Sequence, residues 1–224
     1  MGAYEYLVWR EAEAKNDTPG DVSRLFVYYV GRVRDKQLWR DRTPLADEGM
    51  TLAGAIDALS MKGACLDSSW PFNLERINDS PPADTFNEAM RYKISEAKEI
   101  PTTLTAMKAC LAEGFPIIFG LKLTQNFFRC GRSGLISTPD PRDPKSAEHG
   151  LHAMLIVGYS DAESRFIVRN SWGTDWGDRG YCYIPYDYCA NPTFNFLGQY
   201  AIYALTDTDF TPEPADDHEG LIDR

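Results

Sequence analysis

The sequence predicts an α+β fold, with helices in the first half of the chain and antiparallel strands in the second. The first half holds segments with apolar residues at helical spacing, and the second holds short β-branched and aromatic runs bounded by turns. Two such halves favour two packed lobes with a cleft between them. We expect one domain over residues 1–206, with a helical lobe at about 1–112 and a β lobe at about 113–206.

Four segments of the first half are predicted helices. AYEYLVWREAEAK has apolar residues on one face and stops before the Pro-Gly pair of NDTPGD. DVSRLFVYYVGRV follows with Asp21 as its expected cap, TLAGAIDALSMKG runs from Thr51 to a stop at Gly63, and TTLTAMKACLAEG ends at Gly114. Between the last two, ADTFNEAMRYKISEAKEI fits either a helix or an irregular strand.

Five segments of the second half are predicted strands because they are short, rich in β-branched or aromatic residues and bounded by turns. They are PIIFGLKL from Pro116, AMLIVGY from Ala153, RFIVRN from Arg165, GYCYIP from Gly180 and QYAIYAL from Gln199. A Pro-rich loop, residues 137–150, precedes the second of them, and SDAES is expected to be a hairpin turn between the second and third.

Composition narrows the classes of partner. The net charge is -10 and the pI is about 4.8, which disfavours nucleic acid and anionic membrane surfaces. Residues 207–224 are acidic, contain two Pro and are expected to be a disordered tail.

No apolar run approaches the roughly 20 residues that span a bilayer, and no signal peptide follows Met1. If Met1 is the native start, the sequence predicts a cytoplasmic protein; its oligomeric state stays open.

Metal and cofactor chemistry find little support in the sequence. The five cysteines include no C-x-x-C pair, and their spacing does not fix any disulfide. HGLH places His149 and His152 three residues apart, but no cysteine or fixed carboxylate pair accompanies them, so a metal site is a weak alternative. We expect no metal and no cofactor.

Two polar residues stand where neighbouring strands end. His152 precedes the strand from Ala153, and Asn170 closes RFIVRN, so a hairpin brings them together. The Asn170 amide can then fix the His152 tautomer and aim the other ring nitrogen at a nucleophile, while Trp172 shields the bond from water. A structural histidine beside a Trp-rich hairpin of the core is the alternative.

LHAMLIVGY followed by RFIVRNSWGTDWGDRGY resembles the His and Asn segments of the papain-like cysteine peptidases. SRLFVYY, TLAGAIDALSMKGACLDSSWPF and LAEGFPIIFGLKL are also similar to segments of bacterial-type members. The resemblance implies a papain-like two-lobe fold and peptide or protein substrates. It makes His152 the base, Asn170 its orienting residue and Trp172 the shield, and it places Leu151 and the region of Gly49 along the substrate groove.

The nucleophile of that family is missing from the expected place. The family spacing of roughly 130 to 150 residues before His152 leads to about positions 2 to 22, where no cysteine occurs. The five cysteines present are interpreted as buried or loop residues. AYEYLVWRE resembles the later part of the family's first helix, so the resemblance puts the catalytic Cys and the oxyanion Gln before Met1.

Three interpretations follow. The chain is a shortened form of a cysteine peptidase, or a noncatalytic homologue that binds peptides or a protein partner through the groove, or one part of a site that a second polypeptide completes. In each case we expect these 224 residues alone to be inactive.

Overall fold

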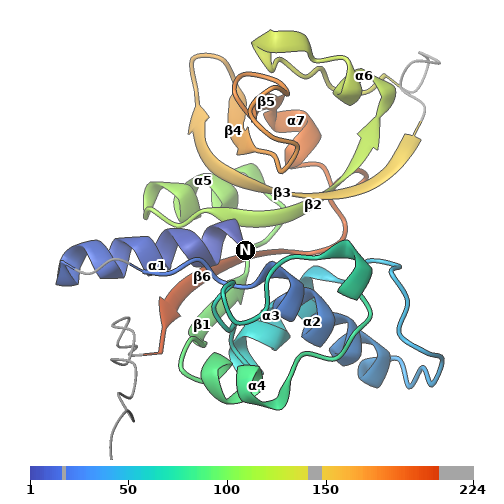
Figure 1. The fold of residues 1–224 in the computed structure, drawn as a ribbon. Coiled ribbons are helices and arrows are strands. Elements are labelled where there is room, and N and C mark those ends of the chain that lie inside the picture. Colours follow the sequence, from blue (N-terminus) through green and yellow to red (C-terminus); the bar gives the residue numbers. More distant parts are fainter. Residues whose placement is uncertain (17–18, 141–147, 207–224) are drawn as a thin grey trace, which may run out of the picture.

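The computed structural model describes residues 1–16, 19–140 and 148–206 (Figure 1). The helices are α1 (Gly2–Lys15), α2 (Arg24–Leu38), α3 (Leu52–Met61), α4 (Ala83–Ala89), α5 (Leu104–Ala112), α6 (Gln125–Phe128) and α7 (Tyr186–Cys189), with 3₁₀ turns at Leu74–Arg76 and Gly131–Ser133. The strands are β1 (Ile94–Glu99), β2 (Ile117–Thr124), β3 (Glu148–Ser160), β4 (Arg165–Arg169), β5 (Tyr181–Pro185) and β6 (Gln199–Leu205). The α+β prediction is confirmed, and the predicted tail, residues 207–224, lies outside the described residues.

The strands of the described residues form one antiparallel sheet in the order β1-β6-β2-β3-β4-β5. In Figure 1, α2, α3 and α4 gather beside β1, while β4, β5, α6 and α7 gather on the other side of the molecule. Two hydrophobic clusters correspond to these two groups. The site described below lies where the two groups meet.

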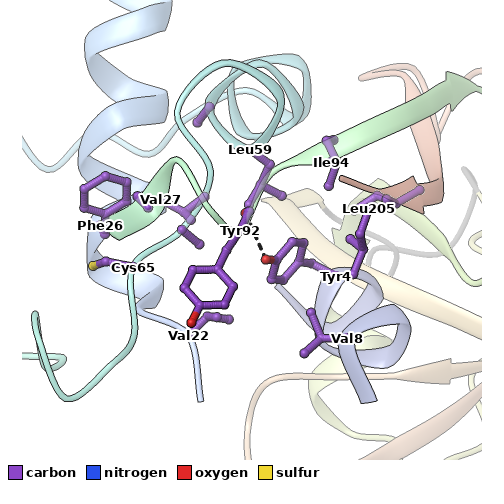
Figure 2. Packing of buried hydrophobic residues seen from close by; sticks show 14 of the residues in the cluster. Tyr4, Val8, Val22, Phe26, Val27, Leu59, Cys65, Tyr92, Ile94 and Leu205 are labelled. Carbon is purple, nitrogen blue, oxygen red and sulfur yellow. Dashed lines mark hydrogen bonds between the residues drawn. The ribbon is translucent and has the colours of Figure 1, made fainter. Parts of the chain in front are cut away.

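α1 packs into the first of these clusters and lies between the two groups of elements (Figures 1 and 2). Tyr4 and Leu7 are fully buried on one face of α1, and the Tyr4 hydroxyl donates a hydrogen bond to the Tyr92 carbonyl at 2.9 Å. The helix ends at Lys15 and is capped by Asn16, whose φ of 54° is a left-handed conformation that Asn tolerates well. This apolar face fixes the helix against β6 and the helical lobe.

α2 begins two residues later than the sequence suggests. Its cap is Ser23 rather than the expected Asp21: the Ser23 hydroxyl accepts from the Phe26 amide at 3.1 Å and donates to the Trp70 carbonyl at 2.6 Å. Ser23 is fully buried, whereas Asp21 is exposed. Both residue types cap helices in isolation, and the buried Trp70 carbonyl favours the hydroxyl, which can donate as well as accept.

Replacing Ser23 by alanine should lower the free energy of unfolding by about 2–3 kcal/mol, because one change removes a helix cap and leaves a buried carbonyl without its donor. Urea unfolding of Ser23→Ala measures this loss. Thr103→Ala is the matched control, since Thr103 caps α5 from an exposed position and accepts only from the Ala106 amide. Equal losses in the two variants would show that the Trp70 bond contributes nothing.

The ambiguous segment after Pro82 contains both structures. Residues 83–89 form α4, a short turn follows, and residues 94–99 form β1, which pairs with β6 through Ala97 and Ile202. β1 is exposed at most of its positions and so lacks the alternation that marks a half-buried strand. Its pairing with a strand about a hundred residues away decides its conformation.

Candidate active site

β3 and β4 bring the predicted His and Asn together. The two strands form the expected hairpin, with Ser160 opposite Arg165 and Leu155 opposite Arg169. Asn170 directly follows β4 and therefore faces the earlier part of β3, where His152 lies. His152 itself is paired with Leu121 of β2, so it stands inside a strand that begins at Glu148. The expectation that the strand starts after His152 was therefore wrong, because pairing with β2 extends it beyond the apolar run.

His152 and Asn170 form a direct hydrogen bond, with 2.8 Å between the imidazole Nε2 and the amide Oδ1. The same Oδ1 accepts from the Ser171 backbone amide at 2.8 Å, so this oxygen serves as an acceptor in both bonds. Nε2 must then carry the proton, which leaves Nδ1 of a neutral His152 with its lone pair free to act as a base. Asn170 is 8% exposed, and burial strengthens the bond that holds the ring.

Trp172 packs against this pair, with 4.9 Å between the centroids of its ring and that of His152. The loop that carries Trp172 and Trp176 depends on its glycines: Gly173, Gly177 and Gly180 all have positive φ. A Cβ on Gly177 would lie 2.4 Å from the Tyr181 carbonyl oxygen, so no other residue fits there without a shift of the backbone. The glycines thus permit the tight loop that holds the two indoles.

A pocket of about 550 Å³ extends from His152 across to the helical lobe. Three of the predicted site residues line it: His152 and Leu151 on the β-lobe side and Gly49 on the helical side. Leu151 is 53% exposed, as a residue that lines an open groove would be. Other lining residues were not singled out from the sequence, among them Trp39, Met50, Gly120, Ala153 and Leu197. They come from five separate segments that only the fold brings together.

Two residues of α2 hold the helical wall of this pocket. The Tyr28 hydroxyl accepts from the Gly49 amide at 3.0 Å and donates to the Asp47 carboxylate at 2.5 Å. Arg32, 3% exposed, donates to the carbonyls of Tyr28, Ala46 and Ile77 and to the Asn78 side chain. Their spacing of four residues, which puts Tyr28 and Arg32 on one helix face, was the signal that sequence reasoning missed.

None of the five cysteines occupies a position from which it could serve this site. All are free and buried, and no cysteine is among the described residues that line the pocket. Burial raises the pKa of all five thiols and is the largest cause of the shift in each. For Cys65 it raises the pKa to about 12. A thiol whose pKa is raised in this way is poorly ionised at neutral pH and is a weak nucleophile.

The described residues contain no group of three or more His, Cys, Asp or Glu side chains arranged to hold a metal ion. The side chain of His149, the partner of His152 in the weak metal alternative, lies outside the described part of the structure. Within residues 1–16, 19–140 and 148–206, no helix combines the length and apolar character needed to cross a bilayer.

Comparison with known proteins places this geometry in a family. A family model described as papain family cysteine protease matches residues 48–193. The solved structure of xylellain, a cysteine protease from Xylella fastidiosa, is similar with a TM-score of 0.77 and 27% identity, over 92% of this chain and 77% of that one.

Curated relatives show the same likeness in sequence. A peptidase C1-like protein of Acanthamoeba polyphaga mimivirus is 28% identical over 84% of this chain, and cysteine proteinase 1 of Dictyostelium discoideum is 33% identical over 54%. The matches span 61% of the viral protein and 35% of the amoebal one. Since the family model matches more than half of the chain and the two-lobe fold agrees, this chain belongs to the papain family of cysteine proteases.

Proposed function

We propose that residues 1–224 carry the base half of a cysteine peptidase site. His152 acts as general base and acid, Asn170 orients its ring, and Trp172 shields the bond between them. Leu151 and the region of Gly49 line the groove for a peptide or protein substrate. The observation that carries the proposal is the 2.8 Å hydrogen bond between His152 Nε2 and Asn170 Oδ1 beside a pocket between the lobes.

The chemistry follows from the free lone pair on His152 Nδ1. A thiol placed opposite this nitrogen would transfer its proton to the ring, and the thiolate would attack the carbonyl carbon of a peptide bond. The imidazolium would return the proton to the leaving amine, giving an acyl-enzyme. A water molecule, deprotonated by Nδ1, would then release the acid and restore the thiol. Asn170 keeps the ring in the orientation that each transfer requires.

We further propose that the 224-residue chain alone does not turn over peptides, because its five thiols are buried and none lines the groove. The thiolate would come from polypeptide beyond these residues, in the same chain or in a second one. The N-terminal end of α1 lies against the strand that carries His152, since a Cβ on Gly2 would lie 3.1 Å from Leu155 Cδ2.

A noncatalytic role is the second candidate, and the absence of a usable thiol favours it. The groove offers Leu151 and Leu197 as exposed apolar contacts, together with a pocket large enough for one side chain of a bound peptide. In this case the protein would hold a peptide or a protein partner without cleaving it.

Assaying the 224-residue chain against a mixed library of fluorogenic peptides tests the inactivity. We expect no hydrolysis that depends on a reducing agent and is blocked by iodoacetamide. Hydrolysis that disappears in His152→Ala would contradict the proposal, since it would mean that one of the buried thiols reaches the site. Binding of the same peptides without cleavage would instead favour the noncatalytic role.

A further inference from the structure

Trp172 is the centre of an aromatic cluster that extends beyond the His152 pair. Two rings meet the indole edge-on: Phe127 at 5.6 Å and Trp176 at 5.2 Å between ring centroids. Phe127 is fully buried and also stacks on Trp176 at 5.3 Å. Phe127 is fully buried and Trp176 partly buried, and together they form what we call the buried floor, on which the Trp172 indole packs.

Phe128 meets the same indole differently. Its ring is stacked on Trp172, with 5.3 Å between the centroids and 17° between the planes, and 49% of the residue is exposed. Trp172 itself remains 37% exposed although four rings contact it. Phe128 therefore covers a part of the indole that the buried floor does not reach, between Trp172 and solvent.

We propose that Phe128 is a positioning residue for His152 and acts through Trp172. This proposal rests on the proposed function in one respect only, namely that the bond between His152 and Asn170 has a catalytic purpose. Stacking by Phe128 restricts the indole to the orientation in which it packs on the imidazole. The indole in turn keeps water from the Nε2–H···Oδ1 hydrogen bond, which a low local dielectric strengthens.

The exposed ring of Phe128 limits the access of water to the indole more than the buried ring of Phe127 does. Phe127 is fully buried, so it contacts the indole on a side that water does not reach. Phe128 is held in α6, a helix of four residues at the end of β2, and lies on the solvent side. Removing it opens the path by which water reaches the indole while costing little core packing.

The test uses the 224-residue chain and needs no turnover. The rate at which the His152 Nε2 proton exchanges with water is measured by ¹⁵N NMR, with the signal assigned through His152→Gln. In Phe128→Ala we expect this rate to rise by about threefold to tenfold, the population change that the loss of one aromatic pair produces. Phe128→Tyr should keep the rate of the parent chain, because the stacked ring is retained.

Phe72→Ala is the matched control, since Phe72 is 55% exposed and lies in the helical lobe, where Arg24 is over its ring. The inference requires this variant to exchange like the parent chain. An unchanged rate in Phe128→Ala, or an equal rise in Phe72→Ala, would overturn it. ¹⁹F NMR of 5-fluorotryptophan at Trp172 provides the second readout: its signal should broaden or shift in Phe128→Ala alone. A change in both readouts supports the inference even if every assay for hydrolysis is negative.

Discussion

Replacing His152 by alanine should lower peptide turnover by about 10⁴-fold or more, in a form of the protein that has a thiol opposite Nδ1. The thiol loses the base that deprotonates it, and the leaving amine loses the acid that protonates it, in one substitution. The other residues that line the groove are unchanged, so kcat should fall while KM stays near that of the parent protein.

The form to assay is the polypeptide that the natural source makes, identified by its intact mass and its N-terminal fragment ions. If it carries a cysteine beyond these 224 residues, Asn170→Ala should also lower kcat, though less than His152→Ala, because the ring keeps its chemistry and loses only its orientation. Phe72→Ala, which changes a helical-lobe residue that does not line the pocket, should keep full turnover. Full turnover in His152→Ala would refute the proposed function, whereas a natural polypeptide without a further thiol would favour the noncatalytic role.

The pairing of His152 with Asn170 could be predicted because both signals are local. Asn170 ends one strand, His152 stands near the start of the strand before it, and a short hairpin must place such residues side by side. Asn170 then meets His152 whichever residue the strand begins with. The error in where β3 begins therefore did not matter for the site.

The rest of the site escaped prediction because it depends on contacts between distant segments. The ring of Phe127 meets Trp172 and Trp176, residues about fifty positions later, and no pattern within one sequence records that contact. The cap of α2 is similar. Ser23 and Asp21 are equally good caps by residue type, and the hydrogen bond from the Ser23 hydroxyl to the Trp70 carbonyl decides between them. In both cases the missing information was the identity of a tertiary neighbour.

The second large effect concerns the buried floor of the aromatic cluster. Phe127→Ala should lower the free energy of unfolding by about 3–5 kcal/mol, because it leaves a cavity at a position with no exposed surface. The loss should also disturb the site, since the same ring supports Trp172 and Trp176. Chemical denaturation measures the first effect, and near-ultraviolet circular dichroism of the tryptophans measures the second.

Phe166→Ala separates the two effects, because Phe166 is equally buried and packs on Tyr186 at 4.8 Å between ring centroids. Among the described rings, the four that contact Trp172 do not include Phe166. It should destabilise the chain by a similar amount, about 3–5 kcal/mol, and leave the tryptophan signal as it is in the parent chain. If both variants changed that signal equally, loosening of the whole β lobe would explain it. If only Phe127→Ala does, the core side chain that stabilises the lobe also holds the shield over His152, and stability and the geometry of the site are linked through one ring.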